Sequence, residues 1–367
     1  MRNDGSCGRG ADRLIFIAAG GTGGHVFPAI CLAKALERRP PESGSLTVVF
    51  CTDTRGARYV SDLTCKVLKQ KISTTSRMAL YVSLIFNTIK SIVKLRKLRP
   101  SVVVGFGGYP SIPYVLAAQL LGIKTAIHEQ NAVLGLANRL LSYAATVIMV
   151  SFPQTAKLRN SRRSTCVGNP SRFEESYRTV KSPNNGTFTI LVFGGSQGSR
   201  VFAYDVAPVI CKVAHSFKMR VFHQCRPEHI DEVERLYVAD NVDHTISDFF
   251  DDIDLLYGQA DLVISRAGAS SIFEIIGFRK PSILIPFKGS INGDQAANAK
   301  FLLDREAAFV LNESDTLQRE LEELILAIIN DRSKLDAIAS VLQTMDVADC
   351  TQRMVRVIEE VAEIGRA

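Results

Sequence analysis

A glycine-rich stretch near the N-terminus ends in a histidine that is placed where it could accept a proton. The stretch LIFIAAGGTGGHVFPA (residues 14–29) is an apolar run typical of a strand, followed by four glycines and then by His25. Glycines let a backbone approach a ligand closely, and the N–H groups that open a following helix bind anionic oxygens. A neutral imidazole at a helix start can act as a general base. We therefore expect a phosphate-bearing ligand at this loop and proton transfer at His25.

Two further glycine-rich turns follow apolar runs, GFGGYP (105–110) and GGSQGS (194–199). None of the three turns has the dinucleotide-binding spacing, because Val26, Pro110 and Ser196 occupy positions that require glycine, and none carries the Gly-Lys-Ser/Thr of a P-loop. In open α/β sheets such turns emerge at the carboxyl ends of strands, where ligands bind. We expect phosphates or diphosphates there. The alternative is that these turns need glycine only for tight packing.

Other polar clusters also follow predicted strands. HEQN (128–131) comes after an apolar run, SRAGASSIFE (265–274) ends in Glu274, and GDQAANA (293–299) offers Gln295 and Asn298. A carboxylate at Glu274 could accept hydrogen bonds from both hydroxyls of a ribose, and the two amides suit sugar hydroxyls. The alternative interpretations are a helix-start charge for Glu274 and a surface position for Gln295.

The order of apolar runs and helical stretches predicts the fold class. Strands at 46–52, 101–108, 124–130 and 145–151 alternate with helical segments such as 27–39 and 78–99. The strand–glycine loop–helix pattern then restarts at 189–203 and continues with MRVFHQC, ADLVISRAG and PSILIPF. This alternation is typical of mostly parallel sheets with helices on both faces.

We therefore predict an α/β chain of two doubly wound domains, 1–168 and 169–345. The basic segment 159–176, which contains Gly168 and Pro170, is the candidate linker. A final segment, 334–363, is predicted to be helical, and the C-terminal helix, about 346–367, could pack on the first domain.

Composition and charge limit the classes of partner that the chain can bind. The chain has 367 residues, no apolar run of the length that a membrane span needs, and a polar N-terminus without a signal-peptide core. We expect it to stay in the cytoplasm. Residues 1–168 carry 23 Lys and Arg against 7 Asp and Glu, whereas the remainder is acidic. Only the first half therefore suits an extended anionic partner, either nucleic acid or an anionic membrane surface. The alternative is an uneven solubilising surface.

The stretch RMALYVSLIFNTIKSIVKLRKLRP (77–100) is the candidate membrane element. On a helical wheel, one apolar face contains Ile85, Phe86, Ile89, Ile92 and Val93, and an adjacent polar face contains Lys90, Lys94 and Lys97. This layout predicts a helix that packs on the sheet and turns its lysines to an anionic surface, with Leu80, Leu84 and Phe86 dipping into lipid. An ordinary helix with solvated lysines is the alternative. Nucleic acid is disfavoured, because no aromatic residues interleave the basic ones.

Taken together, the motifs resemble those of the MurG family, which is glycosyltransferase family 28. They are GGTGGHVFPA, GFGGYPSIP, HEQNAVLGLANR, GNPSR, FGGSQGSR, RAGASSIFE and DQAANA, in the order of the family and within residues 20–299. The resemblance implies a GT-B fold, in which two Rossmann-like domains face each other across a cleft. It also implies transfer of N-acetylglucosamine (GlcNAc) from UDP-GlcNAc to lipid I, the undecaprenyl-pyrophosphoryl-MurNAc-pentapeptide of peptidoglycan synthesis.

The resemblance also implies site residues. Those that would bind UDP-GlcNAc are Thr22, Gly23, Gly24, Asn131, Arg172, Ser196, Ala269, Ser270, Ser271, Glu274 and Gln295, with the backbone near Phe250 holding the uracil. Those at the acceptor and its diphosphate would be Gly20, Gly21, Gly107, Gly108, Tyr109 and His128.

The implied reaction is a direct displacement that inverts the anomeric carbon and gives a β-1,4 linkage. We expect His25 as the base, with Glu129 as the second choice. A helix N-terminus, Ser196 and Arg172 would stabilise the leaving diphosphate. No carboxylate pair with metal-ligand spacing lies beside the loops, so we predict no cofactor and no metal. The enzyme would lie peripherally on the cytoplasmic face of the bacterial inner membrane.

Three other functions remain to be weighed. A UDP-GlcNAc 2-epimerase would share the architecture and the donor but would not need a basic amphipathic face. A non-catalytic module that binds UDP-sugars or lipid would bind without turnover. An NAD-dependent oxidoreductase is disfavoured by the missing fingerprint.

Overall fold

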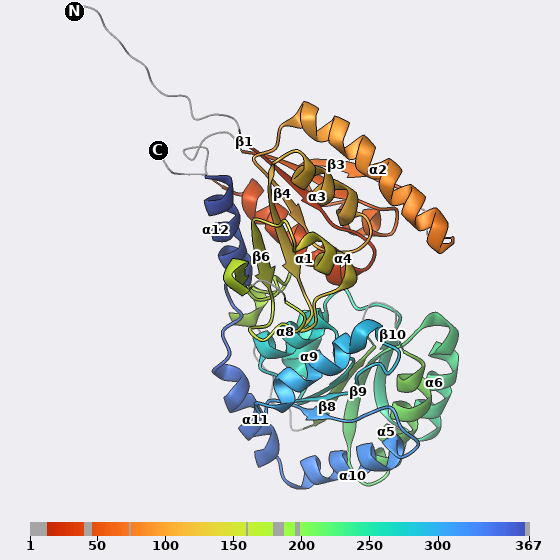
Figure 1. Cartoon of the computed structure of the whole chain (residues 1–367). Helices are drawn as coiled ribbons and strands as arrows, with labels where there is room; N and C mark the ends of the chain where they lie inside the picture. Colours follow the sequence, from red (N-terminus) through yellow and green to blue (C-terminus); the bar gives the residue numbers. More distant parts are fainter. Residues whose placement is uncertain are drawn as a thin grey trace, which may run out of the picture. The chain divides into compact units, whose positions relative to one another are not determined.

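The computed structural model describes residues 13–39, 46–72, 75–158, 161–178, 187–194 and 199–363. The chain forms two compact units (Figure 1). The first comprises residues 1–130, 134–172 and 350–367, and the second comprises residues 131–133 and 173–349. The chain thus passes from the first unit to the second after Arg172, whereas the sequence places the linker around 159–176. Each unit is an α/β structure built on a parallel sheet, which confirms the predicted fold class.

The sheet of the first unit has seven parallel strands in the order β3-β2-β1-β4-β5-β6-β7. Their bounds are β1 Arg13–Ala18, β2 Leu46–Thr52, β3 Lys66–Lys69, β4 Val102–Gly105, β5 Lys124–Glu129, β6 Val147–Val150 and β7 Ser164–Cys166. The central strands β1 and β4 are apolar over most of their length, as expected for a parallel sheet that is covered on both faces, whereas β5 ends in the buried polar residues His128 and Glu129. Successive residues of β1 serve opposite faces, since Ile15 and Ile17 join one core and Phe16 and Ala18 the other.

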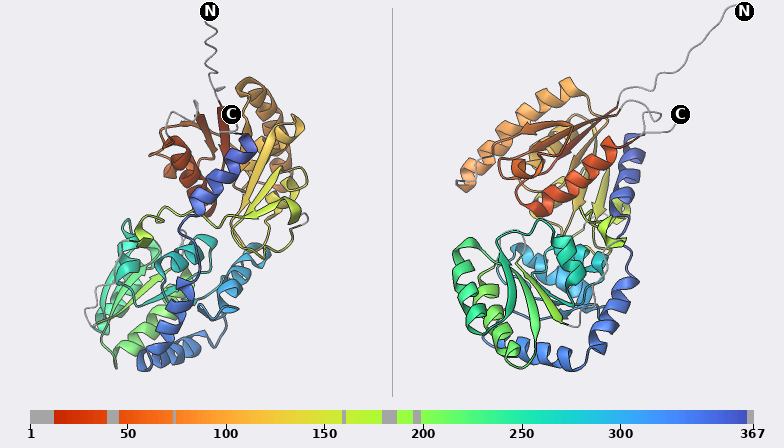
Figure 2. Two further views of the ribbon diagram at one scale, coloured as in Figure 1. Left: turned by 90° about the vertical axis from the view of Figure 1, so that its left-hand side faces the viewer. Right: turned by 180° about the vertical axis from the view of Figure 1, so that it is seen from behind.

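Helices cover both faces of this sheet. They are α1 Gly23–Glu37, α2 Arg77–Leu98, α3 Ser111–Leu120, α4 Leu136–Leu141 and α12 Cys350–Ala362, with short 3₁₀ turns at Gly56–Tyr59 (η2) and Ser161–Arg163 (η3). Figure 2 shows α1 and α12 side by side. In α12, Met354 and Ile358 are fully buried, and Glu359 lies 2.6 Å from a guanidinium nitrogen of Arg39.

The single helix predicted over 334–363 is wrong, because the structure divides it into α11 Ser333–Gln343 and α12. The break lies at residues 344–349. There the Asp346 carboxylate accepts a hydrogen bond from the backbone N–H of Ala348 at 3.3 Å. An aspartate that bonds the backbone two residues on favours a turn over a continued helix.

The second unit repeats the plan with six parallel strands in the order β10-β9-β8-β11-β12-β13. The strands are β8 Phe188–Phe193, β9 Met219–Gln224, β10 Asp243–Ser247, β11 Leu262–Ser265, β12 Ser282–Leu284 and β13 Phe309–Val310. The helices are α5 Ala207–Ala214, α6 Pro227–Ala239, α7 Ile253–Gln259, α8 Ala269–Phe278, α9 Asp294–Leu303, α10 Leu317–Asn330 and α11. Short turns lie at Ser176–Arg178 (η4) and Ile291–Gly293 (η6), and a π-helical turn at Phe202–Val206 (η5) precedes α5.

Helix α2 turns most of its predicted apolar face outward, since Ile92 alone among the five residues of that face packs against the core of the first unit. Its large apolar side chains are 56–71% exposed, namely Met78, Tyr81, Val82, Ile85, Phe86, Ile89 and Val93. The side chains buried on the inner side of the helix are Asn87, Thr88, Ser91 and Leu95. Leu80 and Leu84 are only half-buried, whereas Lys90 and Lys97 are exposed and Lys94 is half-buried.

The polar inner face is tolerated because its groups find hydrogen-bond partners. The Asn87 amide donates to the carbonyl oxygens of Lys71 and Ser83 at 3.2 and 2.8 Å, and the Ser91 hydroxyl donates to the Asn87 carbonyl at 2.8 Å. Buried polar groups that are paired in this way avoid most of the cost of leaving water. A helical wheel identifies the apolar face of a helix, but it does not show whether that face points to the core or to solvent.

Candidate functional site

The first unit brings three loops together at the carboxyl edge of its sheet. Ala18 at the end of β1 pairs with Gly105 at the end of β4, and Gly105 pairs with Ile127 of β5. The loops that leave these strands, 19–22, 106–110 and 130–135, therefore start as neighbours. This is the edge at which open α/β sheets bind ligands.

Two glycines of the second loop are required by its contact with the first. Gly108 has a φ of +71°, and a Cβ on it would lie 2.5 Å from the carbonyl oxygen of Gly20. Gly107 has a φ of +83°, and a Cβ there would lie 3.0 Å from Cδ2 of His25. Side chains are excluded at both positions by conformation and by space. Part of the glycine pattern is thus explained by packing between the loops.

His25 lies in the first turn of α1, with its imidazole against the second glycine loop. Its Nδ1 is 3.4 Å from the Thr22 hydroxyl. Burial lowers the pKa of His25 to about 4, with a further lowering by the Arg55 guanidinium that the Asp53 carboxylate opposes. The ring is therefore neutral at pH 7. If Nδ1 holds the proton and donates it to Thr22, the lone pair of Nε2 can accept a proton from a substrate.

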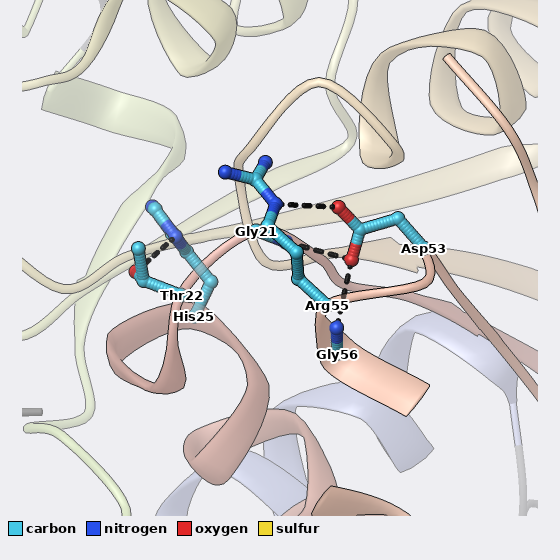
Figure 3. Close-up of polar contacts among 6 residues, drawn as sticks. All are labelled: Gly21, Thr22, His25, Asp53, Arg55 and Gly56. Atoms are coloured by element: carbon cyan, nitrogen blue, oxygen red, sulfur yellow. Dashed lines mark hydrogen bonds and ion pairs between the residues drawn. The ribbon is translucent and has the colours of Figure 1, made fainter. Parts of the chain in front are cut away.

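The Asp53 carboxylate, directly after β2, ties the first glycine loop to the start of η2 (Figure 3). Its Oδ1 accepts hydrogen bonds from the backbone N–H groups of Gly21 at 3.1 Å and Gly56 at 2.9 Å, and Arg55 Nε lies 3.3 Å from Oδ2. Burial alone would raise the pKa of Asp53, but these two N–H groups and the guanidinium outweigh it and hold the pKa below its usual value. Sequence reasoning missed both Asp53 and Arg55, although DTRG (53–56) directly follows the predicted strand 46–52.

His128 is fully buried at the end of β5. Its Nε2 lies 3.0 Å from the carbonyl oxygen of Gly168, and its Nδ1 lies 3.0 Å from the Gln130 amide nitrogen. These partners fix a neutral ring that donates from Nε2 and accepts at Nδ1, in agreement with the lowering of its pKa to about 4 by burial. Through these two hydrogen bonds, His128 can position the loops that contain Gly168 and Gln130. A direct contact to the acceptor stays a prediction.

Glu129, the second choice as base, is also buried, and its carboxylate orders the loop that precedes α4. Its Oε2 accepts hydrogen bonds from the Gly135 N–H and from the Asn138 amide, both at 2.9 Å. Asn138 also donates to the His128 carbonyl at 3.0 Å. The motif containing Asn138 was noted in the sequence, but not its bridging position.

The other predicted residues of the first unit are more exposed. Tyr109 is 44% exposed in the second glycine loop. The Arg172 guanidinium lies 5.0 Å from the centre of the Phe27 ring. Gly24 follows Gly23 in the first turn of α1.

In the second unit, the predicted donor residues cluster around the start of α8. Gly268 precedes the helix in an extended conformation, Ala269 and Ser271 are buried, and Ser270 and Glu274 are half-buried. The Glu274 carboxylate accepts a hydrogen bond from the Tyr257 hydroxyl at 3.2 Å. Phe250 is half-buried in the loop after β10, and the Gln295 side chain accepts from the Phe287 N–H at 2.9 Å. Ser196 lies outside the described residues.

The sequence indicated that the amide of Asn298 would bind a sugar hydroxyl. In the structure this amide instead holds Asn131 and Ala132 in the second unit. The fully buried amide of Asn298 donates to Asn131 Oδ1 and to the Ala267 carbonyl, both at 3.0 Å. Its Oδ1 accepts from the Ala132 N–H at 2.8 Å. Residues 131–133 thereby belong to the second unit although both flanks belong to the first.

Arg266 is a further residue that sequence reasoning missed. Its buried guanidinium donates to the Ser199 hydroxyl at 2.6 Å and to the Ile285 carbonyl at 3.0 Å, and it pairs with the Glu313 carboxylate. It thereby connects the last residue of the third glycine loop, Ser199, to Ile285, the residue after β12. Nothing in a single sequence distinguishes such an arginine from a solvated one.

The described part of the chain contains no group of three His, Cys, Asp or Glu side chains placed to hold a metal ion. Its seven described cysteines are free thiols.

Comparison with known families matches both units. The model of the glycosyltransferase family 28 N-terminal domain matches residues 15–150, and that of the glycosyltransferase family 28 C-terminal domain matches residues 189–354. Together these matches span the loops of both units described above.

The similarity to individual proteins extends over nearly the whole chain. A protein of Wolbachia sp. subsp. Drosophila simulans named UDP-N-acetylglucosamine–N-acetylmuramyl-(pentapeptide) pyrophosphoryl-undecaprenol N-acetylglucosamine transferase is 35% identical, with 94% of this chain and 98% of the relative covered. One of the same name from Rhodospirillum rubrum is 37% identical, with 99% and 96% covered. The crystal structure of Acinetobacter baumannii MurG superposes with a TM-score of 0.80 at 28% identity, covering 95% of this chain and 99% of that one.

The Asn298 contacts generate a prediction about stability and donor binding. We expect Asn298→Ala to lower the free energy of unfolding of the second unit by about 3 kcal/mol, because the buried Ala132 N–H and Ala267 carbonyl each lose a partner at about 1–3 kcal/mol. Urea unfolding and hydrogen exchange at the Ala132 amide measure this. We also expect weaker binding of UDP-GlcNAc, because Asn131 loses its support. Lys300→Ala, at an exposed position of the same helix, is the control, and equal behaviour of the two variants would contradict the prediction.

Proposed function

The chain belongs to glycosyltransferase family 28, and we propose that it transfers GlcNAc from UDP-GlcNAc to the C4 hydroxyl of the N-acetylmuramyl residue of lipid I. The product is the β-1,4-linked lipid II of peptidoglycan synthesis. One observation carries the assignment of the chemistry to this chain: a neutral imidazole, that of His25, lies between two glycine loops at the ligand-binding edge of the sheet.

In this reaction His25 is the base. Its Nε2 takes the proton of the C4 hydroxyl as that oxygen forms a bond to the anomeric carbon of GlcNAc. The bond from that carbon to the diphosphate breaks on the opposite face, and the electron pair leaves with UDP. The anomeric configuration therefore inverts. His25 fits this role better than Glu129, because the Glu129 carboxylate is engaged by the Gly135 N–H and the Asn138 amide.

The donor is bound by the residues that the family resemblance indicates. The Glu274 carboxylate takes the ribose hydroxyls, Gln295 and Asn131 take the sugar, and the backbone near Phe250 takes the uracil. Residues Ala269–Ser271 lie at the N-terminus of α8, a ten-residue helix whose positive end favours a diphosphate. Ser196 and Arg172 add to the stabilisation of the leaving group, and Thr22, Gly23 and Gly24 lie at the reacting end of the donor.

The alternative functions gain no support. A putative UDP-GlcNAc 2-epimerase of Listeria monocytogenes superposes with a TM-score of 0.73, but at 13% identity this likeness shows the fold alone. Transferases of the proposed activity are similar at 35–37% identity over almost the whole chain.

The helix α2 is the proposed membrane-binding element, on the cytoplasmic face of the inner membrane. Within the described part of the chain, it is the one helix that is long and apolar enough to cross a membrane. We propose that it lies on the surface instead, because Asn87, Thr88 and Ser91 are buried against its own unit. Its exposed apolar face can enter lipid while Lys90, Lys94 and Lys97 meet anionic headgroups.

The proposed chemistry predicts the behaviour of a His25 variant. With EDTA present, we expect the protein to transfer labelled GlcNAc from UDP-GlcNAc to a short-chain lipid I analogue. His25→Ala should lower kcat by about 10²–10⁴-fold, because the hydroxyl proton has no positioned acceptor. His215→Ala, which alters an exposed histidine of the second unit, is the control. Full activity of His25→Ala would contradict the role of His25, and absence of transfer by the unaltered protein would contradict the function.

The orientation of α2 predicts an effect on membrane binding. In co-sedimentation with phosphatidylglycerol-containing vesicles, we expect Phe86→Ser combined with Ile89→Ser to lower the partition coefficient at least tenfold, since each buried CH₂ contributes about 0.8 kcal/mol. Both side chains are exposed, so folding should be unaffected. Val238→Ser, at an exposed apolar position of α6, is the matched control. Unchanged vesicle binding of the double variant would refute the placement of α2 at the membrane.

A further inference from the structure

The side chain of Arg55 has one restrained end and one available end. Its Nε lies 3.3 Å from Asp53 Oδ2, and in the described part of the chain this is the only hydrogen bond of the guanidinium (Figure 3). The side chain is 63% exposed, although the Asp53 carboxylate that holds it is only 13% exposed. A cation on a long side chain is thus fixed at its base while Nη1 and Nη2 remain available to a ligand.

The available end lies beside the first glycine loop. Arg55 Nη2 is 3.6 Å from the point where a Cβ on Gly21 would stand. The Asp53 carboxylate that holds Arg55 through Oδ2 also accepts a hydrogen bond from the Gly21 N–H through Oδ1. A Cβ at residue 21 would therefore be in van der Waals contact with the guanidinium. A planar guanidinium with two available nitrogens matches the oxygens of a phosphate group.

We propose that Arg55 binds an oxygen of the diphosphate of the lipid-linked acceptor, and that Asp53 is the positioning residue that holds both Arg55 and Gly21 for this contact. The inference rests on the proposed function and adds a residue to it. We assign the contact to the acceptor because most of the proposed donor contacts, from Phe250 to Gln295, lie in the second unit. The diphosphate of UDP-GlcNAc has the same chemistry, and the experiment below separates the two sources.

The binding of an anion to Arg55 changes the basicity of His25. The groups that face His25 are the Thr22 hydroxyl, which directly precedes its helix, Asp53 and Arg55 from the loop after β2, and the neutral His128 from β5. The positive charge of Arg55 makes His25 harder to protonate. An anion bound to Arg55 offsets that charge, so His25 becomes a stronger base once the acceptor is in place. The charge of the substrate thus helps to activate the residue that takes its proton.

Steady-state kinetics of Arg55 variants test the contact. We expect Arg55→Gln to raise the KM for the lipid I analogue about 10- to 100-fold, in line with loss of a charge-assisted hydrogen bond, and to leave the KM for UDP-GlcNAc within twofold. Arg55→Lys should fall between Arg55→Gln and the unaltered protein. Arg58→Gln, at an exposed arginine three residues on, should change neither constant.

The positioning role of Asp53 has its own signature. Asp53→Asn keeps an oxygen for the Gly21 and Gly56 N–H groups but removes the anionic partner of Arg55. We expect a smaller rise in the KM for the acceptor than in Arg55→Gln. The double variant should be no worse than Arg55→Gln alone, because Asp53 acts through Arg55. Additive effects of the two substitutions would overturn this positioning role.

Titration of His25 by NMR, with inorganic pyrophosphate as the probe, gives a readout that does not depend on activity. We expect pyrophosphate to raise the pKa of His25 in the unaltered protein. In Arg55→Gln the pKa of His25 should be higher without pyrophosphate and should not change when pyrophosphate is added.

An unchanged KM for the acceptor in Arg55→Gln, or the same response of the His25 pKa to pyrophosphate with and without Arg55, would overturn the inference. A rise in the KM for UDP-GlcNAc alone would overturn the assignment to the acceptor. Failure of transfer by the unaltered protein would instead refute the proposed function, and the titration would still test the anion contact.

Discussion

The Asp53 carboxylate is the interaction on which the chemistry of the first unit depends. One side chain accepts the N–H groups of Gly21 and Gly56 and holds Arg55, so the first glycine loop, the start of η2 and a cation share one anchor. A carboxylate that accepts several hydrogen bonds stays ionised, and it keeps these partners in place at neutral pH. The same loop leads directly into α1, which places His25 against Gly107. Asp53 therefore fixes the loop geometry around the base, whereas the neutral state of His25 comes chiefly from burial, with Arg55 lowering its pKa further and Asp53 opposing that lowering.

Polar groups buried at strand ends do similar work elsewhere in the structure. His128, Glu129 and Asn138 connect β5 to α4, whereas Asn298 holds residues 131–133 in the second unit. The hydrogen bonds that these groups make with backbone, amide and carboxylate partners offset much of the cost of burying a polar cluster at a sheet edge. In α2 the same principle lets Asn87 and Ser91 face inward while the apolar side chains face outward.

The sequence was sufficient to predict the long apolar strands and the repeated strand–loop–helix plan, because β-branched runs and glycine turns are local signals. It failed at β3, where Lys66–Lys69 is short and charged, and at the break near Asp346, which depends on one side chain bonding the backbone. It also gave α2 the wrong orientation, since periodicity does not show which face is inside. In the site, His25 was found from its position after a glycine loop. Arg55 and Arg266 were not, because only the folded chain shows what surrounds a charged side chain.

The central claim is that a neutral imidazole, half-buried and placed near a positive charge, takes the proton of the acceptor. The most direct test is the pH dependence of kcat/KM for GlcNAc transfer to the lipid I analogue, which reports the free enzyme. Because the pKa of His25 is lowered to about 4, the account predicts a value that stays within twofold from about pH 5.5 to pH 8. A decline of about tenfold over the same interval, of the kind given by a base with the ordinary histidine pKa of about 6.5, would contradict it.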